Sequence, residues 1–391
     1  MDPRINPYAP GAGTIPPKLA GRDELIEKTS ISLHRYRNGL SSRGLIFVGL
    51  RGVGKTVLLT RIALDAEAEG LVVVSIETPE KRSLPALLIP DLRIALLKLD
   101  RLAAAGAAGK KVLRALGSFV WAMKLKYSDI EFGVDLGNEP GVADSGDLEN
   151  DLVSLFTEVG QLARQRKTVL VLCVDEIQYI PEEQFAALIM ALHKCSQRQL
   201  PVTLIGAGLP QLVGQAGRAK SYAERLFEYP DIGPLSKDAA CRALEIPAQH
   251  LSIHYERKAI DEILKQTHCY PYYLQEWGKH SWNSAVKSPI TLHDVKLATD
   301  VAIAELDTGF FRVRFDRLTP TEKKYLRAMA ELKDGPCRSG DIAQLLKKDV
   351  QSVAPVRANL IKKGMIFSPS HGDNKFTVPL FEGYMKRVMP L

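Results

Sequence analysis

The chain has 391 residues, 46% of them hydrophobic and 25% charged, which is typical of a globular protein of two or three domains and excludes a disordered or fibrous one. No apolar run reaches about 18 residues and the N-terminus lacks a charged-then-apolar signal pattern, so we expect no membrane span and a reducing, cytoplasmic location. The cysteines are odd in number, widely spaced and without a C-x-x-C pair, which argues against a disulfide framework or a zinc site: Cys173, Cys195, Cys241, Cys269 and Cys337.

The net charge of +7 is unevenly distributed along the chain. From residue 311 to the end there are 16 Lys and Arg against eight Asp and Glu, whereas the first 310 residues together carry a net charge of −1. A basic C-terminal part predicts a polyanionic partner, although solvated surface lysines would give the same count.

The first 19 residues hold five prolines and predict an extended lead-in, followed by a helix over residues 21–38. Residues 45–48 are an apolar run typical of a buried strand, and residues 57–68 predict a helix. Between them, residues 49–56 read GLRGVGKT and match the phosphate-binding pattern G-x-x-x-x-G-K-[ST] at every fixed position. The strand before and the helix after the loop are the context that this pattern requires.

The loop predicts a site for ATP or ADP with Mg²⁺. Its glycines let backbone N–H groups converge on phosphate oxygens, and the following helix N-terminus favours negative charge. Lys55 would contact the β- and γ-phosphates and assist catalysis, while the Thr56 hydroxyl would hold Mg²⁺. The residues expected to bind the nucleotide are Gly49, Arg51, Gly52, Val53, Gly54, Lys55, Thr56 and Val57.

Further apolar runs at residues 71–76, 168–174 and 202–206 alternate with helical patterns at 84–101, 147–166 and 186–195. This order predicts an α/β fold, a parallel P-loop sheet with helices on both faces. An insertion over residues 103–146 interrupts the pattern. It contains an Ala/Gly-rich stretch, an alternating segment at 130–136 that predicts a half-exposed strand or hairpin, and a Gly/Asp-rich loop at 137–146.

Two acidic residues, Asp175 and Glu176, follow the apolar run that ends at residue 174. In a parallel sheet they emerge at the same edge as the phosphate loop, where open α/β sheets bind ligands. We expect Asp175 to hold Mg²⁺ and Glu176 to polarise the attacking water as the catalytic base. The alternative is a strand that merely enters a solvated loop.

The pattern from residue 236 to about 305 is helical and predicts a small helical lid. Thr319 and Glu322 then form the spacing of a helix-capping box. Predicted helices at residues 322–332, 339–346 and 350–363 precede a hairpin whose strands are 365–367 and 375–378. Three helices closed by a hairpin predict a winged helix-turn-helix.

The third of these helices carries side chains suited to base edges and phosphates, so double-stranded DNA is the expected partner. Winged helices also dock on proteins, and that alternative stays open. The candidate DNA-binding residues, including one in the hairpin, are Gln351, Ser352, Arg357, Lys362, Lys363 and Lys375.

On these motifs the chain resembles the AAA+ ATPases, most of all the origin-recognition or replication-initiator type and the related STAND group. The resemblance covers nearly the whole chain, from Gly21-Arg22-Asp23 through the phosphate loop and the acidic pair to the lid and the winged helix. It implies an N-terminal segment and helix at residues 1–40, an ATPase core at 41–235, a helical lid at 236–308 and a winged helix at 309–391.

The resemblance implies further roles. Arg22 and Pro271 would pack near the adenine, and Arg225 (or Arg218) would act as an arginine finger on a neighbouring subunit of a homo-oligomer. The strand that would carry the polar sensor 1 ends in Gly-Ala-Gly at 206–208, and Tyr272 stands where a sensor 2 arginine is expected. These departures predict hydrolysis that is slow or stimulated by a partner.

Three functions fit this sequence. The first is an ATP-controlled DNA-binding switch of the replication-initiator kind. The second is a STAND-like signalling or defence ATPase with a regulatory winged helix, and the third is a regulator of transposition or of another mobile element. No nuclease or protease motif is present.

Overall fold

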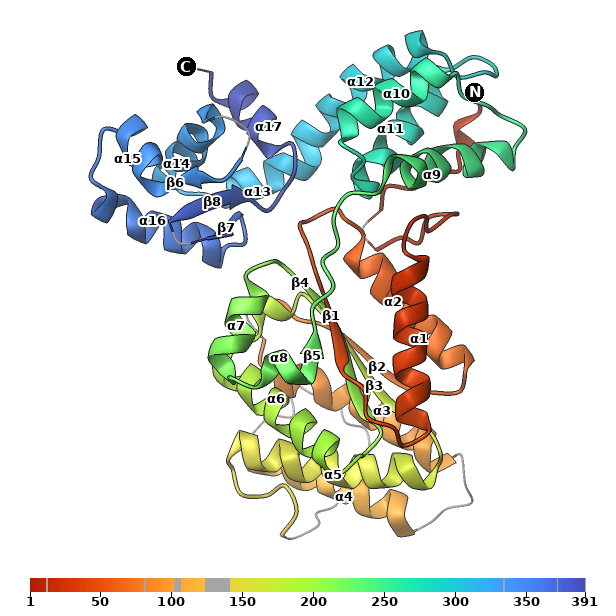
Figure 1. Cartoon of the computed structure of the whole chain (residues 1–391), viewed down its shortest axis with the longest axis vertical. Coiled ribbons are helices and arrows are strands. Elements are labelled where there is room, and N and C mark those ends of the chain that lie inside the picture. Colours follow the sequence, from red (N-terminus) through yellow and green to blue (C-terminus); the bar gives the residue numbers. More distant parts are fainter. Residues whose placement is uncertain are drawn as a thin grey trace.

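A computed structural model describes residues 1–390 except 12, 81, 102–106, 124–140, 333–334 and 371. Figure 1 shows three parts: a sheet with its helices at the bottom, a helical group at the upper right, and a smaller C-terminal unit at the upper left. None of the described helices is at once long enough and apolar enough to cross a membrane.

The central sheet has five parallel strands in the order β2-β3-β4-β1-β5. This confirms the predicted parallel sheet and four of its strands. The fifth, β5, has two residues and was missed because so short a segment has no pattern to detect. The strands are β1 (Gly44–Val48), β2 (Val72–Glu77), β3 (Leu170–Asp175), β4 (Val202–Gly208) and β5 (Phe227–Glu228).

Helices cover both faces of the sheet, which is why the central strands are apolar throughout. In β1, Leu45 and Phe47 join the core under α1 (Asp23–Arg37) and α2 (Lys55–Ala68). Ile46 and Val48 alternate with them and join the core under helices of the other face, α5 (Leu148–Gln165) and α6 (Glu182–Gln197). All five residues of β1 are buried.

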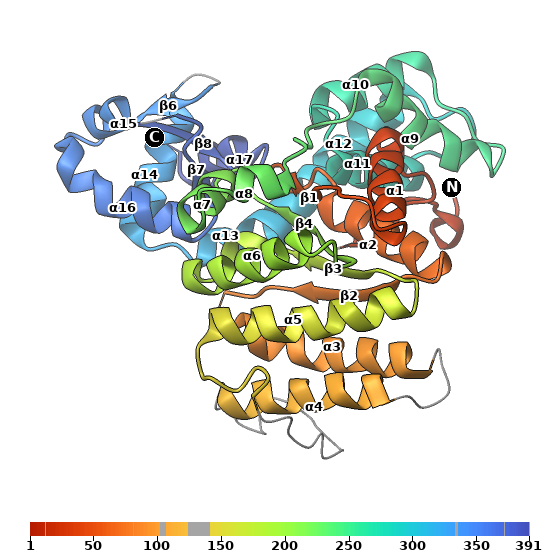
Figure 2. The same ribbon diagram turned by 60° about the horizontal axis from the view of Figure 1, so that its bottom comes forward.

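Two more helices stack beyond β2 and α5, as Figure 2 shows: α3 (Leu84–Arg101) and, farthest from the sheet, α4 (Ala107–Ala122). α4 lies within the predicted insertion. The segment expected to form a strand or hairpin at 130–136 lies outside the described residues. After β4 come two short helices, α7 (Leu212–Ala219) and α8 (Ala223–Leu226).

The four-helix group consists of α9 (Lys237–Gln249), α10 (Arg257–Thr267), α11 (Pro271–Ser284) and α12 (Leu292–Leu306), as the helical pattern predicted. The start of the N-terminal segment, with a short 3-10 helix at Pro3–Ile5, packs against this group. Tyr8 is buried in its core, and the Trp282 indole N–H donates to the Asp2 carbonyl at 3.0 Å.

A π-helical turn (Asp307–Phe311) and α13 (Arg312–Asp316) connect α12 to the C-terminal unit. That unit contains the three predicted helices and the hairpin, and adds β6 (Cys337–Arg338) and α17 (Phe381–Val388). Its antiparallel sheet has the order β6-β8-β7. The remaining elements are α14 (Pro320–Glu331), α15 (Ser339–Leu345), α16 (Val350–Lys362), β7 (Ile366–Phe367) and β8 (Asp373–Phe376).

Candidate nucleotide-binding site

The phosphate loop connects the end of β1 to the first residue of α2. Gly52 and Gly54 have φ angles of +80° and +86°, a region where a side chain would be strained. A Cβ on Gly49 would lie 2.1 Å from the Ile232 carbonyl oxygen. The two fixed glycines of the motif, and Gly52 between them, are therefore required by the backbone path or by close packing.

Lys55 is buried at the start of α2. Its ammonium donates to the carbonyl oxygens of Gly49 at 2.9 Å and Leu50 at 2.8 Å. Burial lowers the pKa of Lys55 to about 8, against the opposing effect of Glu176 and Asp175. The side chain is thus folded back on its own loop, from where it can exchange two carbonyl contacts for phosphate oxygens.

Asp175 ends β3 beside the loop, and the Thr56 hydroxyl donates to its Oδ2 at 2.6 Å. Burial is the main cause that raises the pKa of this carboxyl, partly offset by the Thr56 hydrogen bond. A hydroxyl and a carboxylate in direct contact are hard oxygen donors, which suit Mg²⁺. Thr56 and Asp175 would hold the ion, which supplies charge neutralisation to the bound phosphates.

Glu176 follows in a left-handed conformation, with φ 54° and ψ 37°, which is uncommon for a residue with a side chain and occurs at functional sites. Its Oε1 lies 3.4 Å from Arg51 Nη1, and its Oε2 accepts a hydrogen bond from the Gln178 amide. The Thr78 hydroxyl donates to its backbone carbonyl at 2.6 Å. Both ends of the residue are therefore held in place.

Gln178, on the short 3-10 helix Ile177–Tyr179, also contacts the end of β4. Its Oε1 accepts from the Leu209 backbone N–H at 3.0 Å, and a Cβ on Gly208 would lie 2.8 Å from that oxygen. The glutamine amide thus occupies the space that a side chain at the end of β4 would take. The sequence shows that a polar side chain is missing at 206–208, but no pattern in it indicates that Gln178 fills this place.

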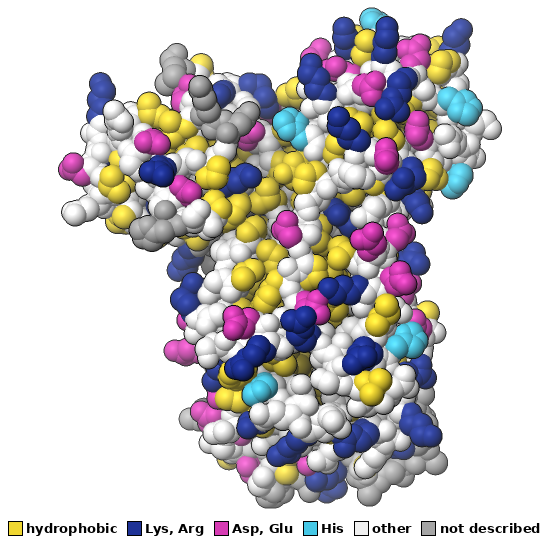
Figure 3. All heavy atoms as spheres, in the orientation of Figure 1, with side chains coloured by type: hydrophobic (Ala, Val, Ile, Leu, Met, Phe, Trp, Pro, Cys, Tyr) yellow, Lys and Arg dark blue, Asp and Glu magenta, His cyan; other side chains and the backbone are white. Residues whose placement is uncertain are grey.

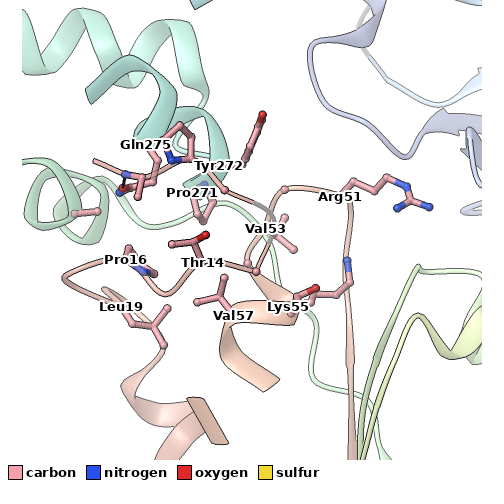
Figure 4. A pocket seen from close by; sticks show the side chains of 18 of the residues that line it. Thr14, Pro16, Leu19, Arg51, Val53, Lys55, Val57, Pro271, Tyr272 and Gln275 are labelled. Carbon is pink, nitrogen blue, oxygen red and sulfur yellow. Dashed lines mark hydrogen bonds between the residues drawn. The ribbon is translucent and has the colours of Figure 1, made fainter. Parts of the chain in front are cut away.

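A cavity of about 540 Å³ lies over the phosphate loop, within the size range of small-molecule sites. The N-terminal segment contributes Thr14, Pro16 and Leu19 to one end, together with Pro271 of α11. Figure 4 shows these residues on the left, Lys55 in the middle and Arg51 to the right. The cavity therefore has an apolar end that suits a base and a charged end that suits phosphates.

The structure places Arg22 and Pro271 on the walls of this cavity, and their packing near an adenine stays a prediction. Arg22 is buried, and its Nη2 donates to the carbonyls of Val53 at 3.1 Å and Gly233 at 2.6 Å. Burial lowers the pKa of Arg22. The arginine holds the loop to the segment before α9, so its contacts are with backbone.

The four-helix group touches the phosphate loop directly at Tyr272, whose backbone N–H donates to the Gly52 carbonyl at 3.1 Å. Just before Pro271, Cys269 has a φ of 59°, a conformation in which glycine is favoured. The backbone at this position thus adopts a conformation that favours glycine, although the residue is a cysteine.

The C-terminal unit also meets the phosphate loop. The Arg51 backbone N–H donates to the Thr377 carbonyl at 2.9 Å, and Arg51 Nη2 donates to the Tyr179 hydroxyl at 2.8 Å. Gly364 packs on the same pair, because a Cβ there would lie 3.0 Å from the Tyr179 hydroxyl and 3.3 Å from Arg51 Nη2. Arg51 therefore contacts Glu176 and the C-terminal unit at once, which no sequence pattern predicted.

Two neighbouring phenylalanines ahead of α14 have different surroundings. Phe311 is fully buried, whereas Phe310 lines the cavity together with Arg314 of α13. Neither Phe310 nor Arg314 belongs to any motif, and they reach the site because the chain returns to it after α12.

The arginine-finger candidates lie away from the cavity of their own chain. Arg225 is exposed on α8, and Arg218 on α7 forms an exposed ion pair with Glu182 at 3.5 Å. Neither lines the cavity. A role for Arg225 on a neighbouring subunit stays a prediction.

Of the six candidate DNA-binding residues, Arg357 and Lys363 are engaged inside the C-terminal unit. Arg357 Nε donates to Asn374 Oδ1 at 2.6 Å, and Lys363 Nζ donates to Glu322 Oε2 at 2.7 Å. Both side chains stabilise the unit and are less available than the helical pattern suggested. The other four are exposed: Gln351, Ser352, Lys362 and Lys375.

Comparisons with known proteins agree with this geometry. Residues 18–205 match the AAA ATPase domain, and residues 308–385 match a domain of unknown function. No curated protein is similar enough to this chain to count as a match.

Among solved structures, the chain is similar to a Walker-type ATPase of Pyrococcus abyssi, with a TM-score of 0.59 and 16% identity over 96% of this chain and 99% of that one. It is less similar to the Aeropyrum pernix Orc1 protein in complex with DNA, with a TM-score of 0.46 and 14% identity over 95% and 94%. The RuvB Holliday junction branch migration motor of Thermotoga maritima has a TM-score of 0.45 and 14% identity, over 96% of this chain and 99% of that one.

The family match covers the phosphate loop, Asp175 and Glu176, and the first of these structures extends the likeness of fold over nearly the whole chain. This protein therefore carries an AAA ATPase domain, in the fold of the AAA+ P-loop ATPases.

Proposed function

We propose that this protein is a switch in which bound ATP controls the position of the C-terminal unit, a winged helix whose partner is double-stranded DNA. The observation that carries the proposal is the contact between Arg51 of the phosphate loop and the C-terminal unit. One residue reaches Glu176 with its guanidinium and Thr377 with its backbone N–H. A change at the phosphates could therefore act on the C-terminal unit through a single residue, Arg51.

The chemistry of the site supports binding and slow hydrolysis. Lys55 and the loop amides bind phosphate, and Glu176 accepts the proton of the attacking water. In this structure, however, the Glu176 carboxylate forms an ion pair with Arg51 at 3.4 Å, while Gln178 orients its other oxygen. A carboxylate that is neutralised by a guanidinium is a weaker base, so we expect low turnover until Arg51 is withdrawn.

Charge and exposure support DNA as the partner. The last 81 residues carry the excess of Lys and Arg, and four candidate contacts on α16 and β8 are exposed. On the face shown in Figure 3, Lys and Arg side chains are spread over all three parts, while hydrophobic side chains gather at the centre of the molecule. Net charge gives affinity for phosphates, and the α16 side chains would give the contact to bases.

The test measures ATP binding and duplex binding by the intact chain. We expect Lys55→Ala to lose ATP binding and with it the ATP dependence of DNA binding. Lys362→Ala should weaken duplex binding at low salt by several-fold and reduce its salt dependence, whereas the exposed α12 control Lys296→Ala should not. Duplex binding that is absent at low salt in both nucleotide states would refute the DNA partner.

A second candidate function is favoured by the internal bonds of Arg357 and Lys363. In it, the C-terminal unit is a regulatory clamp of a signalling ATPase and binds no nucleic acid. Measuring hydrolysis alongside these binding experiments separates the two: hydrolysis that rises when the C-terminal unit is displaced, without any duplex binding, supports the clamp.

A further inference from the structure

A half-buried guanidinium on α13, that of Arg314, lines the nucleotide cavity. Among the described residues, no carboxylate lies within 4.0 Å of it. Its hydrogen bond goes to the Phe310 carbonyl at 2.5 Å. An unpaired positive charge on the wall of a cavity that binds phosphates is expected to pair with the bound anion.

The side chain is aimed by an aromatic stack. The Arg314 Cζ lies 3.9 Å from the centre of the Phe310 ring, and that ring stacks on Tyr272 with centroids 4.8 Å apart and an interplanar angle of 26°. Tyr272 is in turn bonded to the phosphate loop through the Gly52 carbonyl. The stack runs without interruption from the loop to the guanidinium, which is an arrangement that fixes orientation.

Arg314 is also affected by the positive charge of Arg51, which belongs to the phosphate loop. Burial, and then the positive charge of Arg51, lower its pKa to about 10. Arg51 in turn is paired with Glu176, which acts at the terminal phosphate. Two guanidinia that destabilise each other before the nucleotide binds would both be stabilised by the charge of that phosphate.

We propose that Arg314 contacts the terminal phosphate of ATP and is the residue through which the chain distinguishes ATP from ADP. The inference rests on the proposed nucleotide switch and names the residue that senses the terminal phosphate. Because α13 connects α12 to α14, a shift of Arg314 toward the phosphate displaces the first helix of the C-terminal unit. The nucleotide state is thereby passed to that unit through covalent structure as well as through Arg51.

The test compares ATP·Mg²⁺ with ADP·Mg²⁺ affinity in the full-length chain. We expect Arg314→Met, which keeps the aliphatic stem, to weaken ATP binding about tenfold or more and ADP binding less than about twofold. Arg312→Met is the matched control, since Arg312 is exposed on the same helix and forms an ion pair with Asp316 at 3.6 Å. Equal losses for the two nucleotides, or none, would overturn the assignment.

A second measurement needs no variant of Arg314. Phenylglyoxal modifies accessible arginines, and mass spectrometry locates the adducts. We expect ATP·Mg²⁺ to protect Arg314 in the parent chain, ADP·Mg²⁺ not to protect it, and Arg312 to react equally in all samples. If ATP binds to the parent chain but does not change the modification of Arg314, the inference about Arg314 is overturned and the proposed function is not. If the parent chain binds neither nucleotide, the proposed function fails instead.

Discussion

At the scale of single residues, Glu176 combines an uncommon backbone conformation with two polar partners. Its left-handed φ brings the carboxylate within 3.4 Å of Arg51, and Gln178 holds the second oxygen. Loss of the carboxylate charge removes the proton acceptor but leaves the loop, Lys55 and Asp175 in place. A variant that lacks this charge should therefore lose hydrolysis but still bind ATP.

We predict that Glu176→Gln lowers kcat by about 100-fold or more while the affinity for ATP changes by less than about threefold. Single-turnover hydrolysis and equilibrium binding of ATP·Mg²⁺ measure the two effects. The exposed acid Glu27 gives a control, because Glu27→Gln should change neither. A Glu176→Gln chain that hydrolyses ATP at the parent rate would exclude Glu176 as the base.

Gln178 offers a second residue-scale prediction, because it bridges Glu176 and the Leu209 N–H. Gln178→Ala leaves Glu176 free to rotate, so we expect kcat to fall about tenfold and ATP affinity to stay within about twofold. In Gln178→Glu we expect kcat to fall further, since the new carboxylate would repel that of Glu176. A positioning role is contradicted if both variants lower KM and kcat in the same proportion.

At the scale of elements, the sequence was informative where a pattern repeats or a motif is fixed. The apolar runs predicted four strands, and the capping-box spacing predicted α14, with Glu322 Oε2 accepting from the Thr319 N–H at 2.7 Å. Two-residue strands such as β5 and β6 carry no period and were not found. Their pairing depends on contacts with strands far away in the sequence.

The residues of the site also differ in whether the sequence predicts them. Lys55 and Thr56 were predicted from the fixed spacing of the loop motif, and Asp175 and Glu176 from their place at the end of an apolar strand. Arg314 reaches the cavity only through the path of the chain after α12, and nothing local marks it. For α16, the helical pattern was right about exposure at four positions, but it could not show that Arg357 and Lys363 bond within their own unit.

The start of α14 gives a prediction with a definite pH direction. Burial favours protonation of Glu322, but the bonds from Lys363 and from the Thr319 N–H outweigh it, so the pKa lies below its ordinary value. A lowered folded-state pKa adds stability above the unfolded value, about 4.3, and that stability is lost as the pH falls through the folded value. The carboxylate therefore stabilises the fold at neutral pH.

We expect Glu322→Gln to cost about 1–2 kcal/mol of unfolding free energy at pH 7 and to flatten the decline of stability below about pH 4.5. Denaturant unfolding at pH 7, 5 and 3.5 tests this. Lys363→Met should reproduce the loss at pH 7 with little effect on duplex binding. A Glu322→Gln chain whose stability at pH 7 equals that of the parent would refute the role of the pair.

At the scale of the whole molecule, the phosphate loop is the point where the sheet, the four-helix group and the C-terminal unit meet. Tyr272 joins it from α11 through Gly52, and Thr377 joins it from the C-terminal unit through Arg51. The nucleotide therefore binds where three parts of the chain share one loop. Ligands that bind such a junction change the relative positions of its parts if their affinity differs between arrangements.

This junction predicts opposite changes at adjacent backbone amides. In the Glu176→Gln chain, which holds ATP, the amides of residues 52–56 should exchange with deuterium more slowly because they bind phosphate. The Arg51 amide should exchange faster, because its bond to the Thr377 carbonyl is lost when the C-terminal unit moves. ADP should slow the first group and leave Arg51 protected.

Hydrogen exchange with fragmentation that resolves single residues measures both signals in one peptide. Lys55→Ala, which should not bind nucleotide, provides the control in which no amide changes. If ATP slows exchange at Arg51 together with its neighbours, the C-terminal unit stays docked in the ATP state. The contact between Arg51 and Thr377 would then be a fixed part of the fold, and the output of the ATPase would have to be sought in the neighbours of Glu176 instead.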